Sequence, residues 1–182
     1  MTTRAGGDAD ADAFAEVFAR HRDRAVRLAY LHCGDRDRAE EAVAEAMAKV
    51  FRRWRRGGIR DVGPYLRVAV VNEVRAGGRR RVRDRALVDR AGGELVTRAG
   101  GAPDGRGGPD AGDALGQRDE LVAALQRLPE RQRLAVVLRH VEGLSEAETA
   151  EAMGISVGGV KSQCSRGLDA LRAVLTTGEV ER

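Results

Sequence analysis

The chain has 182 residues, of which 42% are hydrophobic and only 3% aromatic, so it can form one ordinary domain or two small ones with a core built largely from Ala, Val and Leu. No apolar run approaches the roughly 20 residues of a membrane span, and the acidic start MTTRAGGDADADAF lacks the apolar stretch of a signal peptide. We therefore expect a cytoplasmic protein with no membrane insertion.

The net charge of +4 is unevenly distributed along the chain. Residues 51–90 carry 13 Lys or Arg against 4 Asp or Glu, whereas residues 1–50 carry 8 against 10. The corresponding counts are 3 and 6 in residues 91–120, and 8 and 8 in residues 121–182. A localised basic block is expected of a protein that binds nucleic acid, although solvated helix faces and disordered tails also carry basic runs.

The residues that most often build metal and catalytic sites are scattered. Cys33 and Cys164 belong to no CxxC or Cys/His spacing, and we interpret both as small buried hydrophobic residues, with a redox role as the alternative. The three His residues are distant from one another, no Ser/His/Asp or metal-ligand spacing occurs, and GDRDRAEE lacks the register of an EF-hand loop. We therefore predict no catalytic residue, no metal and no cofactor.

Apolar residues in the first half of the chain recur at helical spacing, in two stripes. Asp35 is a candidate N-cap for the second helix, and RRGGIRDVGP, which ends at Pro64, separates it from a third. Pro64 suits the first turn of that third helix, which runs through YLRVAVVNEVR, and we expect Gly77 and Gly78 to fray or bend it. The two stripes are Phe14, Val17, Phe18, His21, Ala25 and Leu28, and then Ala39, Val43, Ala46, Met47, Val50, Phe51 and Trp54.

A Gly-rich segment divides the chain into two lobes. Residues 91–116 contain nine of the 23 glycines, Pro103 and Pro109, and almost no periodic apolar residues. Such a segment cannot bury enough apolar surface to offset its ordering entropy, so we predict a flexible linker. The sequence thus predicts an all-α fold with two small helical domains, residues 1–90 and 117–182.

The second lobe ends in a predicted helix-turn-helix. Pro129 is placed to open a helix and Gly143 to close it. Ser145 and Glu148 then have the spacing of a capping box, and Gly154 marks a tight turn before a final amphipathic helix. The second helix of a helix-turn-helix normally lies in the major groove of DNA. The apolar positions of this lobe are Leu121, Ala124, Leu125, Leu128, Leu134, Val137, Leu138 and Val141, then Val160, Cys164, Leu168, Leu171 and Leu175.

The final helix starts on Gly158 and Gly159, although each Gly costs a helix interior about 1 kcal/mol relative to Ala. Ser156 can cap this helix, and the glycines would leave backbone N–H groups free to approach a phosphate at the positive end of the helix dipole. The face opposite the apolar stripe offers donors for phosphates and base edges, with a merely solvated face as the alternative. Its residues are Lys161, Ser162, Gln163, Ser165 and Arg166.

Two polar faces are predicted in the first lobe. Three carboxylates recur every four residues on the side of the second helix away from its apolar stripe, and an ordinary solvated face is the alternative to a docking ridge. If the third helix continues, an amide for base edges and guanidinium groups for phosphates share one of its faces. The acidic ridge is Asp37, Glu41 and Glu45, and the basic face is Asn72, Arg75, Arg79 and Arg83.

Two aromatic residues, Trp54 and Tyr65, flank the loop between the second and third helices. Aromatic rings at such a place could stack on unpaired bases. Core packing is the favoured role for both.

Two segments together resemble the extracytoplasmic-function group of bacterial RNA polymerase sigma factors. The C-terminal one is LPERQRLAVVLRHVEGLSEAETAEAMGISVGGVKSQCSRGLDALR, which is similar to region four of that family. The N-terminal one is GDRDRAEEAVAEAMAKVFRRW followed by PYLRVAVVNEVR, which is similar to region two. The resemblance covers nearly the whole chain, and the two segments in this order are far more specific than either alone.

This resemblance implies a non-enzymatic protein that binds core RNA polymerase and promoter DNA and directs transcription initiation, with an anti-sigma factor as a further candidate partner. Region four of the family reads the minus-thirty-five promoter element. Gly159 stands at a position where Thr is common in the family, and Gln163 at one where a basic residue is common. The family's usual base preference in the promoter element therefore cannot be transferred to this chain. By position, the contacts would come from Ser156, Gly159, Lys161, Ser162, Gln163, Ser165 and Arg166.

Region two of the family docks on the clamp helices of the largest polymerase subunit and melts the minus-ten element. The segment from Arg36 to Trp54 matches the docking helix, where Ala44 replaces the usual Gln and the acidic ridge would make the contacts. Asn72 matches an Asn that contacts the melted strand, and the loop from Arg56 to Gly63 matches the one that holds a flipped-out base. The minus-ten residues implied are Arg56, Arg60, Asn72, Arg75 and Arg79.

A stand-alone helix-turn-helix transcriptional regulator is the main alternative. This alternative would explain the second lobe, but it gives no function to the acidic ridge and the basic helix of the first lobe. A purely structural interaction protein is a further alternative that composition alone does not exclude.

Overall fold

The computed structural model describes residues 4–59, 61–90 and 120–180. Within these residues the backbone forms helices joined by turns and contains no β-strand, which confirms the predicted all-α fold. The predicted linker, residues 91–116, lies outside the described residues. None of the helices in the described part is both long and apolar enough to cross a bilayer.

The described residues form two compact units. The first contains those of Met1–Tyr30 and Arg36–Arg79, and the second contains those of Leu31–Asp35 and Arg80–Arg182. The Leu31–Asp35 segment, in which the first helix ends, is therefore grouped with the C-terminal helices.

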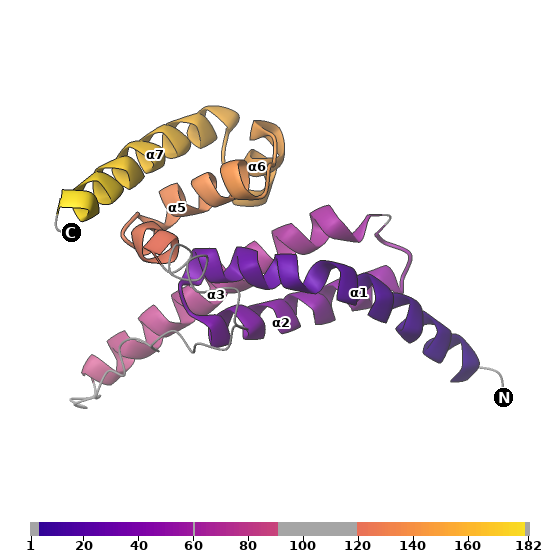
Figure 1. Ribbon diagram of the computed structural model, residues 1–182. Coiled ribbons are helices and arrows are strands. Elements are labelled where there is room, and N and C mark those ends of the chain that lie inside the picture. Colours follow the sequence, from indigo (N-terminus) through magenta and orange to yellow (C-terminus); the bar gives the residue numbers. More distant parts are fainter. Residues whose placement is uncertain (1–3, 60, 91–119, 181–182) are drawn as a thin grey trace, which may run out of the picture. The chain divides into compact units, whose positions relative to one another are not determined.

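The first unit is built from α1 (Arg4–Cys33) up to Tyr30, α2 (Arg36–Trp54), and α3 (Val62–Arg90) up to Arg79. These parts lie alongside one another in Figure 1. The apolar stripes are largely buried, as predicted. Phe14 of α1 packs on two aromatic residues of α2, with ring centroids 4.8 Å from Phe51 and 5.6 Å from Trp54. The buried core includes Ala25, Leu28, Ala39, Val43, Ala46, Met47 and Val50, and in α3 Leu66, Val70, Val71 and Val74.

The start and the middle of α3 differ from the sequence-based prediction. Asp61 Oδ1 accepts a hydrogen bond from the N–H of Gly63 at 3.0 Å, and the helix begins at Val62, two residues before Pro64. The helix also continues through Gly77 and Gly78, so the predicted fraying is wrong. Once a helix is nucleated, each further residue adds a hydrogen bond, and a local cost of about 1 kcal/mol per Gly does not end it.

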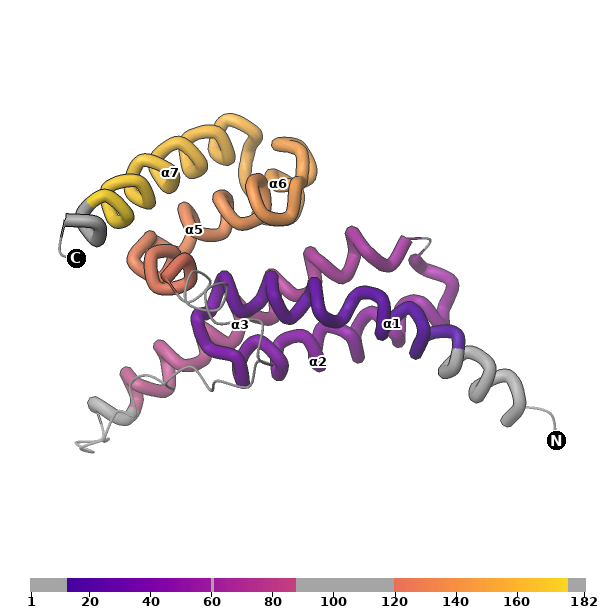
Figure 2. Tube along the Cα trace, viewed as in Figure 1, coloured from indigo at the N-terminus to yellow at the C-terminus, as the bar shows by residue number. Residues whose placement is uncertain are grey.

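The second unit contains the predicted helix-turn-helix, which Figure 2 follows from α6 into the long α7. Pro129 precedes α5 as expected, and the helix then widens into a π-helical turn before Gly143, where the N–H of Glu142 donates to the carbonyl of Val137 at 3.0 Å. The elements are a helical segment over residues 120–126, α5 (Glu130–Val136), η1 (Val137–Val141), α6 (Glu146–Met153) and α7 (Val157–Val180).

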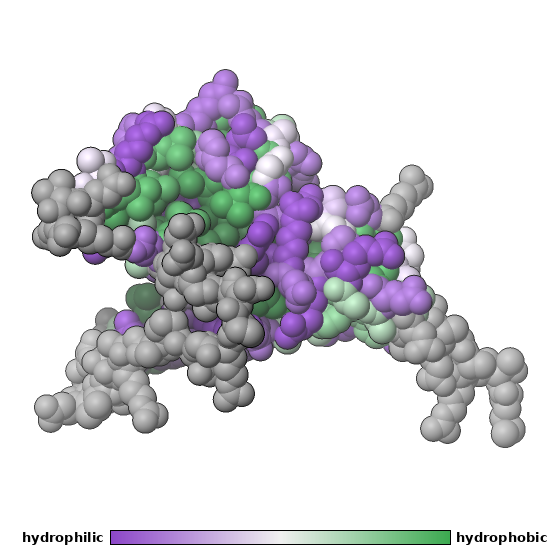
Figure 3. Space-filling view, in the orientation of Figure 1, coloured by the Kyte–Doolittle hydropathy of each residue, from purple (hydrophilic) through white to green (hydrophobic). Residues whose placement is uncertain are grey.

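A close approach between α5 and α7 organises this unit. A Cβ atom on Gly167 would lie 2.7 Å from Cγ2 of Val136 and 3.1 Å from the carbonyl oxygen of Gln132, so only Gly allows the two helices to meet here. Val160 of α7 is fully buried. Leu175 is 46% exposed, so the apolar stripe of α7 is not buried along its whole length, and Figure 3 shows apolar surface beside α5 and α7.

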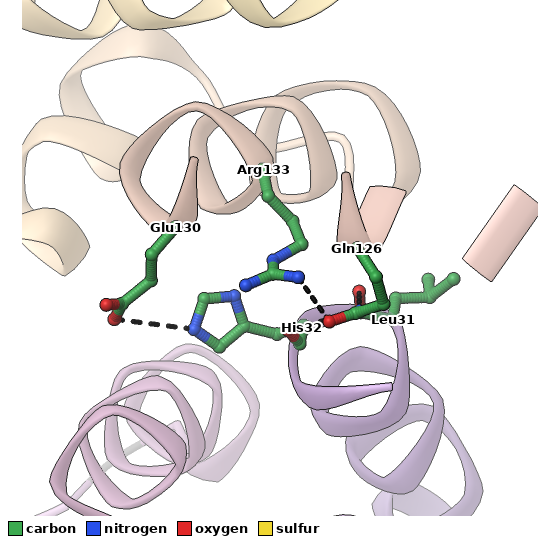
Figure 4. Close-up of polar contacts among 5 residues, drawn as sticks. All are labelled: Leu31, His32, Gln126, Glu130 and Arg133. Carbon is green, nitrogen blue, oxygen red and sulfur yellow. Dashed lines mark hydrogen bonds and ion pairs between the residues drawn. The ribbon is translucent and has the colours of Figure 1, made fainter. Parts of the chain in front are cut away.

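Polar contacts hold the Leu31–Asp35 segment, which contains the end of α1, within the second unit (Figure 4). Gln126 donates from Nε2 to the carbonyls of Leu31 and His32 at 3.3 and 3.4 Å, and it accepts a hydrogen bond from Arg133. His32 Nε2 lies 3.8 Å from Glu130 Oε1. Burial lowers the pKa of Arg133, while Glu130 acts in the opposite direction.

Candidate nucleic-acid interface

The N-terminus of α7 is capped as the sequence predicts. The N–H of Gly159 donates to Oγ of Ser156 at 3.1 Å, and the N–H of Val160 donates to the carbonyl of Ser156 at 3.0 Å. The expectation that both glycines leave their N–H groups free is therefore wrong for Gly159, because the cap already uses that donor. Gly158 is exposed, with open space where a side chain would lie.

The polar face of α7 is mostly exposed, and contacts within the helix hold its Arg166 side chain. Lys161, Ser162, Ser165 and Arg166 are exposed, whereas Gln163 is half-buried. Arg166 donates from Nε to the carbonyl of Ser162 at 3.3 Å, and its guanidinium also donates to the Ser162 hydroxyl. Ser162 thus positions a guanidinium that can bind a phosphate or a guanine edge.

The helix before α7, which is α6, is capped at both ends. Ser145 Oγ accepts from the N–H of Glu148 at 3.2 Å, and Glu148 Oε2 accepts from the N–H of Ser145 at 2.8 Å, which confirms the capping box. At its end, Gly154 adopts φ of +65°. The N–H of Ile155 donates to the carbonyl of Ala150 at 3.1 Å, which completes a Schellman motif that only Gly enters without strain.

Across this turn, α6 and α7 are joined by an ion pair that the sequence did not predict. Lys161 Nζ lies 3.5 Å from Glu146 Oε2. Burial raises the pKa of the Cys164 thiol, which Arg139 opposes and Glu146 reinforces. Cys164 is half-buried, and so is Cys33, so the expected burial of both is only partly met.

The polar face of α3 depends on a contact with another helix. Asn72 is exposed, and its neighbour Glu73 is only 8% exposed. Glu73 Oε1 lies 2.5 Å from Nζ of Lys49, 24 residues away on α2. This pair fixes α3 against α2 at the turn that carries Asn72. Because α3 is continuous, Asn72 and the exposed Arg79 share a helix face, whereas Arg75 is half-buried and makes contacts of its own.

The loop between α2 and α3 starts as a helix cap. Gly57 has φ of +71°, its N–H donates to the carbonyl of Trp54 at 2.8 Å, and the N–H of Gly58 donates to the carbonyl of Arg53 at 3.1 Å. This is a second Schellman motif, and it leaves the neighbouring Arg56 side chain exposed. Arg60 lies outside the described residues.

The two aromatic residues beside this loop have different surroundings. Trp54 packs on Phe14 and Phe51, which confirms the predicted core role. Tyr65 is 38% exposed, and the Arg53 guanidinium lies 5.5 Å from its ring centroid, so the core role predicted for Tyr65 is wrong. Tyr65 is therefore the more exposed of the two rings, and a guanidinium lies near it.

The acidic ridge of α2 is exposed over part of its length. Asp37 and Glu41 are exposed, but Glu45 is half-buried and makes contacts of its own. Ala44, between them, is exposed. Only the first two carboxylates therefore form an outward-facing surface.

Sequence reasoning missed Lys49, Glu73, Glu146 and Gly167, because each owes its role to a residue on another helix. Gly167 could have been found from its position inside an amphipathic helix. A Gly there lowers helix stability, so it often marks a place where another helix approaches closely. Asp61 could have been found as an N-cap residue directly before α3. In the described part of the chain, no group of three His, Cys, Asp or Glu side chains is placed to hold a metal ion.

Comparison with known proteins gives consistent results. Residues 118–171 match the family Sigma-70, region 4. The chain is 33% identical over 176 residues to RNA polymerase sigma factor CarQ of Myxococcus xanthus, covering 96% of this chain and 94% of CarQ. It is 32% identical over 180 residues to ECF RNA polymerase sigma factor SigM of Mycobacterium tuberculosis, covering 93% and 82%.

A solved structure shares the fold. It is the sigma factor RpoE from Bartonella quintana in complex with the anti-sigma factor NepR, with a TM-score of 0.70, 22% identity, and coverage of 90% of this chain and 97% of that one.

Proposed function

The chain belongs to the extracytoplasmic-function family of RNA polymerase sigma factors, and we propose that it directs core polymerase to promoters through DNA-facing surfaces in both of its units. Proteins of this family act in transcription initiation, and the family is not one of enzymes. A protein that binds core polymerase must be in the compartment where bacterial DNA is transcribed, so the proposed location is the cytoplasm.

Recognition of the upstream promoter element is assigned to α7. The observation that carries the proposal is the exposed polar face of a capped helix-turn-helix, with Arg166 held by Ser162 and the helix start held by Ser156. Such pre-positioned donors lose little conformational entropy on binding. Lys161, Ser165 and Arg166 would contact phosphates or base edges, and Gly159 would lie near the sugar-phosphate backbone of the DNA.

Melting of the minus-ten element is assigned to α3 and the loop before it. Asn72 offers an amide to an unpaired base, Arg79 and Arg56 offer guanidinium groups to phosphates, and Tyr65 offers an exposed ring. Arg75 is a weaker candidate, because it is half-buried. The capped loop would hold the displaced base.

Docking on the clamp helices of core polymerase is assigned to the outward carboxylates of α2. Asp37 and Glu41 are exposed, so a basic partner can reach both. Replacing Glu41 with Lys should weaken binding to core, measured by competition with another sigma factor. Glu16→Lys is the matched control, because it reverses an exposed charge on α1 instead. Equal affinity of both variants would contradict the docking role.

An anti-sigma factor is a further proposed partner. The support is the RpoE structure, in which a protein of the same fold was solved with the anti-sigma factor NepR. The test is to purify the tagged chain from its own cells and to identify the proteins that co-purify with it. The Glu41→Lys variant should lose core polymerase, which distinguishes core from other partners.

Core-dependent initiation is the decisive test of the function. Purified chain added to core polymerase should produce transcripts that start at defined sites, and promoters can be selected from a random library with the reconstituted holoenzyme. The free chain should bind the same promoters only weakly, because the two DNA readers must be held at a fixed spacing. Equal promoter specificity with and without core would instead support a stand-alone regulator.

Strand opening tests the assignment of α3. Unstacking a base costs a few kcal/mol, and only contacts made in the open state offset that cost. Asn72→Ala should therefore leave holoenzyme assembly intact, impair open-complex formation on duplex DNA, and recover on a template with a pre-melted bubble. Permanganate footprinting of unpaired thymines measures this, and normal opening on duplex DNA would contradict the assignment.

A further inference from the structure

The ion pair between α6 and α7 involves one of the residues proposed to contact DNA. Lys161 Nζ lies 3.5 Å from Glu146 Oε2, and the two side chains are 64% and 39% exposed. Lys161 is the first cationic residue of α7, at its fifth position, where an anion at the helix N-terminus would lie nearby. In the absence of DNA, its charge is therefore shared with a carboxylate of the neighbouring helix.

The other carboxylates of α6 are placed differently. Glu148 belongs to the capping box, where its Oε2 accepts from the N–H and the hydroxyl of Ser145 at 2.8 and 2.7 Å. Glu151 is exposed in the last turn of the helix. Glu146 lies beside Lys161 of α7, and its charge also contributes to the raised pKa of the Cys164 thiol.

This placement has a consequence for DNA binding. The first helix of a helix-turn-helix crosses the DNA backbone, so an acidic side chain at its start faces phosphates. A phosphate that approaches Lys161 must compete with Glu146 for the same ammonium group, and it is also repelled by the carboxylate. Exposed ion pairs of this kind change equilibria by a factor of about two to five.

We propose that Glu146 is an attenuator of DNA binding: it holds the Lys161 ammonium on α6 and lowers the affinity of the free chain for DNA of any sequence. The proposal rests on the function assigned to α7 above and adds a regulatory residue to it. A sigma factor that binds random DNA weakly stays available to core polymerase, which then supplies the second DNA contact.

The test uses the full chain and a fluorescent duplex of random sequence at low salt. Glu146→Gln should tighten binding about two- to five-fold and steepen the salt dependence by up to about one phosphate contact, because Lys161 is released to the backbone. Glu151→Gln is the matched control, since it removes the same charge from the same helix. An equal effect of the two variants would overturn the proposal, because net charge alone would then explain the gain.

A second background isolates the pair. In a Lys161→Gln chain, the gain from Glu146→Gln should fall to the part that comes from direct repulsion by the carboxylate, and a full gain there would overturn the proposal. Glu146→Asp retains the charge in the first turn of α6 but is one methylene shorter. It should give part of the gain while thermal unfolding stays unchanged, and native affinity of this variant would count against the ion pair.

Failure of this inference is distinct from failure of the proposed function. If a chain with both Lys161→Gln and Arg166→Gln binds the duplex as tightly as the native chain, α7 is not the DNA reader, and both the proposed function of α7 and the attenuator role of Glu146 are wrong. If the holoenzyme initiates normally but Glu146→Gln binds random DNA like the native chain, only the attenuator is wrong.

Discussion

The proposed DNA-facing side of α7 is held by contacts within the helix-turn-helix, whereas that of α3 is held by a pair 24 residues apart in the sequence. Ser156 and Ser162 act three and four residues away from their partners. By contrast, Lys49 reaches Glu73 only because α2 packs on α3. A short segment can therefore specify the geometry of α7, but the orientation of Asn72 depends on a folded helix pair.

The largest expected effect tests the long-range contact. Lys49→Ala leaves the buried Glu73 carboxylate without its ammonium partner and should lower the free energy of unfolding by about 2 kcal/mol, less than a fully buried pair because Lys49 is half-exposed. Glu40→Ala, which breaks the exposed Arg36–Glu40 pair of the same helix, should cost under about 0.5 kcal/mol.

Urea unfolding followed by helical circular dichroism measures both losses. A double replacement, Lys49→Met with Glu73→Leu, should recover most of the stability, because apolar residues of similar volume replace a buried pair at little cost. Equal small losses for Lys49→Ala and Glu40→Ala would erase the contrast between the two surfaces.

The second effect concerns the close approach between α5 and α7 at Gly167. Gly167→Ala places a Cβ against Val136 and the Gln132 backbone, and overpacking should cost about 1–2 kcal/mol after the gain in helix propensity. Gly158→Ala meets open space and should be neutral or stabilise by up to about 1 kcal/mol. Thermal unfolding of the two variants compares them, and a stable Gly167→Ala protein would show that α5 and α7 can separate at little cost.

A third prediction sharpens the local side of the comparison. Ser156→Ala removes the cap on the Gly159 N–H and should destabilise α7 by about 1 kcal/mol. Ser156→Asp keeps a capping oxygen, so its stability should match the native chain, but its charge should weaken promoter binding at the proposed phosphate contact. If both variants bind promoter DNA like the native chain, Ser156 is only a cap.

The smallest effect is a pH dependence at Cys164, on the packed side of α7. Burial raises the pKa of this thiol, so the unfolded chain loses the proton first as the pH rises. The stabilisation is complete below the usual thiol pKa of about 8.5 and is lost as the pH rises through the raised value. Unfolding between pH 7.5 and 9.5 should therefore show a steeper loss for the native chain than for Cys164→Ser, and identical slopes would contradict the burial.

Most of the helices, and the caps at Ser145 and Ser156, were predictable from sequence, because they depend on residues three or four positions apart. The buried stripe of α2, the Ser145–Glu148 box and the Ser156 cap are examples. The polar face of α7 followed from the same periodicity, and the resemblance of two segments to one family supplied the promoter and polymerase roles.

Tertiary structure alone decided which of those polar residues are accessible and what holds them. Glu45, Arg75 and Gln163 lie on predicted polar faces but are half-buried. The sequence predicted the same core role for Tyr65 and Trp54, but in the structure Trp54 packs on Phe14 whereas Tyr65 is exposed. The Lys49–Glu73 and Glu146–Lys161 pairs join residues on different helices, and helical periodicity carries no information about which helices meet.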